Sequence, residues 1–151
     1  MIFQSFLIIF IYKLINLDLL LFCDIILLTK IIFKQMENCI FCKIANKEIE
    51  TNILYENNNI IAFPDINPIA PVHVLIIPKK HIASINDLDN YDQKIISDII
   101  LAAKKISKDL DISEDGYKLL FRVGKNGGQE IPHIHLHLIG GAKLHEDIRP
   151  I

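Results

Sequence analysis

The sequence is poor in the features that mark several large classes of protein. Its 151 residues include three cysteines, too few for a disulfide framework, and a reducing, cytoplasmic setting fits them better. The formal net charge is −2, and there is no long basic run of the kind that binds a nucleic-acid backbone. Internal repeats and interdomain linkers are absent from the sequence. Length and composition therefore favour one domain, and we expect no nucleic acid among its partners.

Residues 1–35 differ from the rest of the chain, yet they lack what a membrane span or a signal peptide needs. They are rich in Ile, Leu and Phe, but the longest uncharged run, Met1–Tyr12, is shorter than the ~20 residues of a spanning helix. A longer span would include Asp18, at a cost of roughly 2.5–3.5 kcal/mol. A basic start and a small-residue cleavage site are missing. We interpret residues 1–35 as a hydrophobic extension that results from a mis-set start codon, with a membrane anchor as the alternative. Residues 36–151 are then the domain, and Met36 is its expected start.

Hydrophobic periodicity predicts an antiparallel sheet covered by one long helix. Short apolar runs at 52–56 and 59–63, separated by Asn57-Asn58, predict a β-hairpin. We expect further strands at residues 72–77, 117–123 and 131–139. A helix over 88–110 is predicted by apolar residues at steps of three and four, namely Leu88, Tyr91, Ile95, Ile99, Ala102, Ile106 and Leu110. The additional apolar positions Ile96 and Ile100 suggest that this helix meets a partner. The expected fold class is α+β, with a meander of about five strands.

Three histidines alternate with aliphatic residues between Pro132 and Gly140. Alternate side chains of a strand point to opposite faces, so His133, His135 and His137 share one face. The intervening aliphatic residues share the other face, which belongs in a core. The imidazole ring is nucleophilic, nearly neutral at physiological pH and a good leaving group once phosphorylated. We therefore favour a reaction site lined by histidines, with a solvated or metal-binding strand edge as the alternative.

This motif and the segments around it resemble the histidine-triad (HIT) superfamily, and within it the Hint branch of histidine-triad nucleotide-binding proteins. The signature His-x-His-x-His is followed here by hydrophobic residues and preceded by Gly127-Gly128-Gln129. The blocks at 63–68, 70–73 and 77–81 follow the first half of that branch in order and spacing. The resemblance covers about residues 37–142. It implies a HIT-like fold and a homodimer in which the sheet continues across the interface.

The resemblance implies a hydrolase that cleaves purine nucleoside phosphoramidates, which are AMP or GMP joined to an amine. In that family the middle histidine attacks the α-phosphorus, and water then releases the nucleoside monophosphate from a nucleotidyl-histidine. Carried over to this chain, His135 is the nucleophile, His137 contacts a phosphate oxygen or the scissile position, and His73 is the buried supporting histidine. This chemistry requires no metal. The alternatives are a dinucleoside polyphosphate hydrolase of the Fhit-like branch and a nucleotide-binding regulatory module with little turnover.

By the same resemblance, the nucleoside lies against apolar residues and its ribose hydroxyls bind the carboxylate of Asp65. Ordinary core packing and a turn role are the alternatives for these residues. Arg122 and Glu130 depart from the family, which often has an asparagine and a small hydroxyl residue there. Arg122 is compatible with phosphate binding, whereas an inward-pointing Glu130 would repel phosphate. The expected nucleotide contacts are Ile40, Phe41, Ile44, Phe63, Asp65, Ile66, Arg122, Gly128, Gln129 and His137.

Cys39-x-x-Cys42 is half of a metal site, and by itself it indicates zinc, redox chemistry or nothing. A redox motif belongs in a thioredoxin-like βαβ pattern, which this sequence lacks. A structural zinc needs two further ligands, for which His81 and His133 are the remaining candidates. A subset of bacterial Hint-branch proteins resembles this pattern and carries a Cys2His2 structural zinc. The resemblance therefore implies a closed zinc site formed by Cys39, Cys42, His81 and His133.

Overall fold

The protein is described by a computed structural model in which residues 24, 27, 30 and 38–145 are placed. The chain divides into two units, Met1–Asn38 and Cys39–Ile151, and the fold below is that of the second. Apart from three positions, the hydrophobic extension predicted over residues 1–35 lies outside the described residues, so its interpretation stays a prediction. Among the placed residues, no helix combines the length and the apolar character needed to cross a bilayer.

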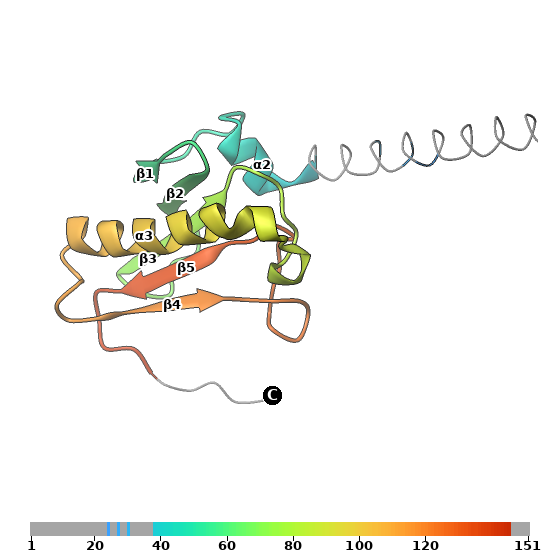
Figure 1. The fold of residues 1–151 in the computed structure, drawn as a ribbon. Coiled ribbons are helices and arrows are strands. Elements are labelled where there is room, and N and C mark those ends of the chain that lie inside the picture. Colours follow the sequence, from blue (N-terminus) through green and yellow to red (C-terminus); the bar gives the residue numbers. More distant parts are fainter. Residues whose placement is uncertain (1–23, 25–26, 28–29, 31–37, 146–151) are drawn as a thin grey trace, which may run out of the picture. The chain divides into compact units, whose positions relative to one another are not determined.

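A five-stranded antiparallel sheet with the strand order β1-β2-β3-β5-β4 forms the framework of the domain. Its strands are β1 (Tyr55–Glu56), β2 (Ile60–Pro64), β3 (Val72–Pro78), β4 (Tyr117–Phe121) and β5 (Leu136–Gly140). Figure 1 shows α3 (Gln93–Asp109) lying across these strands, with β4 at one edge of the sheet. The predicted α+β class, with an antiparallel sheet of five strands and one long helix, is confirmed, although β5 lies between β3 and β4 and the order is therefore not that of a simple meander.

The strand that carries the histidine motif is shorter than predicted, because it begins at Leu136. Pro132 has no N–H for a strand ladder, and the next two residues bond elsewhere. The N–H of His133 donates to the carbonyl of Ile131 (2.8 Å), and that of Ile134 donates to the carbonyl of Ile82 (2.7 Å). His133 and His135 therefore lie in a bent segment that leads into the strand.

Period-two alternation assigns the two faces of the sheet to two different helices. On one face, alternate residues such as Ile60, Ile76 and Leu136 are fully buried beneath α3 in the larger core. On the opposite face, Ile61, Phe63, Leu75 and Ile77 pack with the short helix α2 (Ile40–Ala45). As predicted, Ile134, Leu136 and Leu138 belong to the core under α3. The sheet thus has one purely structural face and one face on which polar chemistry is placed.

The long helix begins later than predicted, and the expected apolar stripe fails at both of its ends, because Tyr91 and Leu110 are exposed. Two 3-10 turns, Ile85–Asp87 and Asn90–Asp92, precede α3. The side chain of Asp89 accepts from the N–H of Tyr91 (2.7 Å), and the Asp92 side chain accepts from the N–H of Asp89 (3.2 Å). These caps hold the 3-10 conformation, whose three-residue turn rotates Tyr91 away from the core, so that it is 91% exposed. Ile96 packs partly against the core, whereas Ile100 is exposed.

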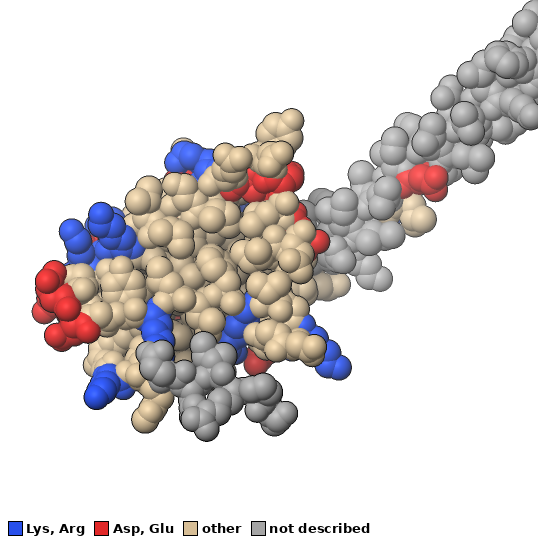
Figure 2. Space-filling model, turned by 60° about the horizontal axis from the view of Figure 1, so that its bottom comes forward, with Lys and Arg blue, Asp and Glu red and all other residues tan. Residues whose placement is uncertain are grey.

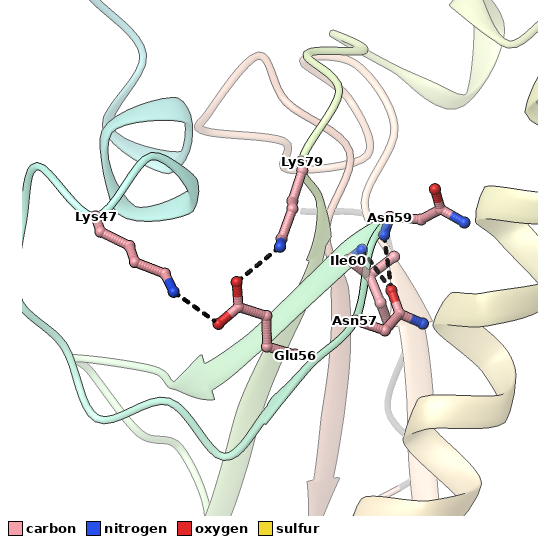
Figure 3. A network of polar contacts seen from close by, with 6 residues as sticks. All are labelled: Lys47, Glu56, Asn57, Asn59, Ile60 and Lys79. Atoms are coloured by element: carbon pink, nitrogen blue, oxygen red, sulfur yellow. Dashed lines mark hydrogen bonds and ion pairs between the residues drawn. The ribbon is translucent and has the colours of Figure 1, made fainter.

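Polar contacts fix the turn between β1 and β2 and tie it to neighbouring segments (Figure 3). The Asn57 side chain accepts from the N–H groups of Asn59 (2.8 Å) and Ile60 (2.9 Å), so the predicted turn signal acts through its side chain. The Glu56 carboxylate binds Lys79 (2.7 Å) and Lys47 (3.2 Å). Lys47 follows α2 and Lys79 follows β3, so this network joins two segments that position the site.

Candidate active site

A cavity of about 550 Å³ opens on the face of the sheet that packs with α2. This volume suits a small-molecule ligand. Apolar residues of α2 form part of its wall, together with the β2–β3 loop and the segment that leads into β5. The lining residues include Ile40, Phe41, Ile44, Ile49, Glu50, Phe63, Asp65, Ile66, His73, Arg122, Gly128, Glu130, Ile131, His135 and His137. All predicted nucleotide contacts except Gln129 therefore face one cavity.

Gln129 does not line the cavity, because its side chain is occupied in the loop before the histidine motif. Its amide nitrogen donates to the carbonyls of Ala83 (2.6 Å) and Ile131 (3.0 Å). Its amide oxygen accepts from the N–H of Gly124 (3.0 Å). Gln129 therefore shapes the loop that presents Gly128, and its direct contact with a nucleotide stays a prediction.

His135 lies at the cavity wall, and one of its ring nitrogens is already hydrogen-bonded within the protein. Its Nδ1 atom is 2.7 Å from the carbonyl oxygen of His133. Because a carbonyl oxygen only accepts, we assign the ring proton to Nδ1. The lone pair is then on Nε2, and the ring is oriented by a rigid backbone partner. This is the arrangement that a nucleophilic imidazole requires.

His137 and His73 form a buried pair beside His135. His137 faces Leu75 across the β3–β5 ladder, so His73, two residues from Leu75, is its diagonal neighbour on the same face. The distance from His73 Nε2 to His137 Nδ1 is 2.9 Å. The centroids of the His135 and His137 rings lie 4.9 Å apart. Three imidazoles, from β3, from β5 and from the residue just before β5, therefore meet at one side of the cavity.

The partners of His73 determine which nitrogen of His137 carries a proton. The N–H of Ile69 donates to His73 Nδ1 (3.4 Å), and the carboxylate of Asp65 is 3.3 Å from His73 Nε2. Both contacts require the His73 proton on Nε2, where it is donated to His137 Nδ1. His137 then carries its own proton on Nε2. Within the described part of the chain this buried atom has no hydrogen-bond partner. A buried donor left open is a site for a ligand oxygen.

Burial favours the neutral form of this histidine pair. Loss of solvent lowers the pKa of His137 to about 4, with smaller contributions from His135 and Arg122. Burial also lowers the pKa of His73, while the nearby carboxylate of Asp65 opposes that change. An anion bound in the cavity would add a second negative charge near the pair and favour its protonated form. The pair can therefore take up a proton when an anionic ligand enters.

Arg122 brings a positive charge to the same end of the cavity. Gly128 has φ +73°, and a Cβ added there would lie 3.7 Å from Arg122 Cδ, so the arginine side chain passes beside this glycine. The guanidinium also lowers the pKa of both His73 and His137, which places its charge near the pair. Glu130 lines the cavity close by in the chain. Arg122 and Glu130, the two residues that depart from the family pattern, thus both line the cavity.

A second cluster, whose residues do not line the cavity, brings together Cys39, Cys42, His81 and His133, with their donor atoms within 4.8 Å of one another. His133 Nδ1 is 3.4 Å from Cys39 Sγ, 3.6 Å from Cys42 Sγ and 3.2 Å from His81 Nδ1. Cys42 Sγ is 3.2 Å from His81 Nδ1. In a regular tetrahedral zinc site, S–N and N–N edges are about 3.6 and 3.3 Å, given the usual bond lengths. The cluster could therefore hold a metal ion with little movement.

The surroundings of the cluster also suit a cation. The Nε2–H of His133 donates to the carbonyl of Pro78 (2.9 Å), which leaves the Nδ1 lone pair directed at the cluster. Burial raises the pKa of the Cys42 thiol to about 12, and Cys39 adds to the effect. Two adjacent thiolates are costly here unless a cation compensates their charge, because a metal deprotonates the thiols that bind it. The predicted ligand set is thus brought together, and His133 faces this cluster instead of the cavity.

Several lining residues had no part in the sequence prediction. Ile131 is two residues before His133, and extending the period-two pattern backwards by one step would have found it. Asn67 and Ile69 flank predicted positions in the β2–β3 loop. Residues 49–51 carry no motif, and their place at the cavity depends on the turn after α2. Nothing in the sequence pattern therefore pointed to them.

Comparison with known proteins gives consistent matches. The family model described as the HIT domain matches residues 46–144. The purine nucleoside phosphoramidase of Escherichia coli (strain K12) is 43% identical over 108 residues, which cover 72% of this chain and 91% of that protein.

Solved structures agree with these sequence matches. A HIT family hydrolase from Legionella pneumophila Philadelphia 1 is 51% identical, with a TM-score of 0.71, over 72% of this chain and 97% of that chain. A histidine triad nucleotide-binding protein from Candida albicans is 34% identical, with a TM-score of 0.64, over 76% of this chain and 86% of that chain.

Proposed function

Because this chain belongs to the HIT domain family and is a hydrolase of that family, we propose that it cleaves purine nucleoside phosphoramidates through a nucleotidyl-histidine. The resemblance drawn from the histidine motif is thus confirmed at the level of the family. One observation carries the proposal. The Nδ1–H of His135 is held by a carbonyl at 2.7 Å, so its Nε2 lone pair is free beside the open Nε2–H of His137.

In the first half of the reaction, His135 Nε2 attacks the α-phosphorus. A bond forms between Nε2 and phosphorus, and the phosphorus–nitrogen bond to the amine breaks. The leaving nitrogen takes a proton from the His73–His137 pair, which acquired it when the anionic phosphate entered. Asp65, 3.3 Å from His73 Nε2, stabilises the protonated pair. The products of this step are the free amine and nucleotidyl-His135.

In the second half, water replaces the amine. Water attacks phosphorus and gives a proton to His137 Nε2, while the bond to His135 breaks and its electrons return to Nε2. The nucleoside monophosphate leaves, and the pair loses the proton to solvent. General acid–base catalysis by one pair in both halves accounts for the placement of two buried histidines next to the nucleophile.

Ligand binding divides between the two ends of the cavity. The apolar wall of α2, with Phe63 and Ile66, suits a purine base, and Asp65 suits the ribose hydroxyls as an acceptor. Arg122 and the region of Gly128 suit the phosphate. The experiment that tests the proposal compares turnover of a fluorogenic adenosine phosphoramidate with that of a diadenosine polyphosphate. A marked preference for the second substrate would support the dinucleoside polyphosphate hydrolase, and turnover of neither would support a binding module.

We also propose that the cysteine–histidine cluster binds one structural zinc ion. The support is the donor set and its spacing, together with the carbonyl that orients His133. All four positions of a tetrahedral zinc would be filled by Cys39, Cys42, His81 and His133, so no coordination position is open to substrate. Zinc would join α2 to the segment that follows β3, through His81, and to the segment that precedes β5, through His133. The reaction itself proceeds on histidine.

A homodimer is proposed on the edge of the sheet formed by β4. Its outer side has no neighbouring strand among residues 38–145. Leu119 of β4 is 40% exposed, and Leu101 of α3 is 59% exposed. In Figure 2, where the lower side of Figure 1 is turned toward the viewer, charged side chains lie mostly around the margin of an uncharged middle. An edge strand with exposed apolar residues is suited to pairing with a second copy.

A further inference from the structure

We propose that this enzyme prefers phosphoramidates whose leaving amine bears a second, positively charged group, and that Glu130 recognises that charge. This inference rests on the proposed function, because it concerns the amine that the reaction releases. It names the class of leaving amine, which the attack by histidine does not itself select.

Three carboxylates line the cavity, and their partners differ. Asp65 is engaged, since it lies 3.3 Å from His73 Nε2 and accepts from the N–H of Asn67 (2.9 Å). Within residues 38–145, neither Glu50 nor Glu130 makes a hydrogen bond or an ion pair. Arg122 lines the same cavity without pairing with either of them. Glu50 and Glu130 are therefore the two cavity carboxylates whose charge is not already shared with another residue of this part of the chain.

The two available carboxylates belong to different ends of the cavity. Glu130 lies two residues after Gly128, beside which the Arg122 side chain passes, and directly before Ile131. It therefore belongs to the phosphate end. Glu50 follows Ile49 in the turn after α2, and it belongs to the apolar end. Only Glu130 is positioned next to the group that leaves the phosphorus.

The direction of attack sends the leaving group toward Glu130. The entering and leaving atoms of a phosphoryl transfer lie roughly in line. His135 is buried, at 6% exposure, so the amine departs on the opposite side of the phosphorus, toward solvent. Glu130 is exposed and lines the cavity, which puts it at the rim. A chain that extends from the amine would pass this rim.

The charge at the rim then discriminates between ligands. A carboxylate attracts an ammonium or guanidinium group on the leaving amine and repels further phosphates. A polyphosphate chain would carry its additional negative charges into this region. The preferred substrate therefore has one phosphorus centre and a leaving group such as a diamine or a basic side chain.

The test uses two adenosine 5′-phosphoramidates of matched size, one made from n-butylamine and one from 1,3-diaminopropane. At pH 7.5 the free amine of the second is protonated. We expect kcat/KM in the full chain to be about three- to tenfold higher for the diaminopropane substrate, and the ratio to shrink at high salt. Glu130→Gln should bring the ratio to about one. Glu50→Gln is the matched control, and it should retain the preference.

The outcomes separate this inference from the proposed function. Equal kcat/KM for the two substrates in the wild-type protein, or an unchanged ratio in Glu130→Gln, overturns the inference while phosphoramidase activity stands. Failure to turn over either substrate, with a diadenosine polyphosphate cleaved instead, overturns the proposed function. Circular dichroism and AMP binding confirm that each variant is folded.

Discussion

His133 connects two clusters: its carbonyl oxygen is 2.7 Å from Nδ1 of His135, the proposed nucleophile, while its own Nδ1 atom is 3.4 Å from Cys39 Sγ. One residue thus orients the proposed nucleophile with its backbone and faces the proposed metal site with its side chain. The link between them is covalent, so the position of one cluster constrains the other. The first three predictions follow from this arrangement and from the buried pair beside it.

Replacement of the proposed nucleophile should abolish turnover. We expect His135→Ala to reduce kcat by more than about 1000-fold, because no other step can replace the covalent one. AMP binding should be largely retained, since His135 is one of many wall residues. Mass spectrometry of quenched wild-type protein should detect a nucleotidyl group on His135. The exposed His145 provides the control His145→Ala, and a His135→Ala variant with a tenth of wild-type activity would contradict the assignment.

Removal of zinc should affect stability more than the initial rate. We expect about one zinc per chain in protein purified without chelator, lost at acid pH because the thiolates become protonated. A strong chelator and Cys39→Ser should each lower Tm, with activity surviving at low temperature. His133→Ala should resemble Cys39→Ser. Its zinc content should fall because a ligand is lost, and its activity should survive because the backbone carbonyl that holds His135 remains.

Cys23→Ser provides the matched thiol control and should retain zinc. Metal analysis that finds no zinc in the untreated protein would remove this proposal.

Stability should decrease as the pH falls from about 6.5 toward 4. The pKa of His137 in the folded protein is about 4, whereas an unfolded histidine titrates near 6.5. Between these values the unfolded chain binds more protons, so the free energy of unfolding rises with pH in this window. The contribution of His137 is complete above the unfolded pKa and is lost as pH falls toward the folded one.

Thermal melts of the wild type and His137→Gln across this range measure the effect. The variant should have a shallower dependence of Tm on pH than the wild type in the same metal state. His145→Gln should leave the slope unchanged. Parallel curves for wild type and His137→Gln would show that burial does not suppress protonation of this residue.

A chain that starts at Met36 should fold and be fully active. Every residue assigned to the cavity or the metal cluster follows this position. The measurement is kcat/KM and Tm of the shortened and full chains side by side. Loss of folding on truncation would show that residues 1–35 belong to the domain.

The proposed dimer should be sensitive to charge on the β4 edge. We expect sedimentation at micromolar concentration to give a dimer for the wild type. Leu119→Lys should shift it toward the monomer, because a lysine on an exposed edge strand opposes strand pairing. Ile66→Lys, which changes an exposed apolar residue outside β4, is the control for surface charge. A monomeric wild-type protein would contradict the proposal.

Local patterns predicted most of the fold, because period and turn chemistry act over a few residues. Alternation placed Ile134, Leu136 and Leu138 in the core, and Asn57 marked the hairpin turn. The pattern did not predict where β5 begins or that Tyr91 leaves the helical stripe. Those details depend on the bond from Ile134 to the distant Ile82 and on the caps at Asp89 and Asp92.

The candidate site was predictable to the extent that it follows a motif. Spacing grouped the histidines, but it assigned His133 and His135 to one strand face, whereas the ring of His133 faces Cys39 and Cys42, which do not line the cavity. The side-chain bonds of Gln129 could not be predicted either, because its contact with the carbonyl of the distant Ala83 cannot be read from neighbours in sequence. The tautomers of the histidine pair required the contacts of Ile69 and Asp65.

The alternation along β5 also makes catalytic activity a measure of correct folding. Leu136 and Leu138 face the core under α3, and His137, between them, faces the cavity. A slip of one residue would exchange these faces in a single step. It would bury an imidazole under α3 and expose leucine to substrate, so a misaligned chain would be unstable and inert at once. A population that retains full specific activity after refolding therefore contains few molecules with a misaligned β5. The loss of specific activity relative to the native protein measures the misaligned fraction.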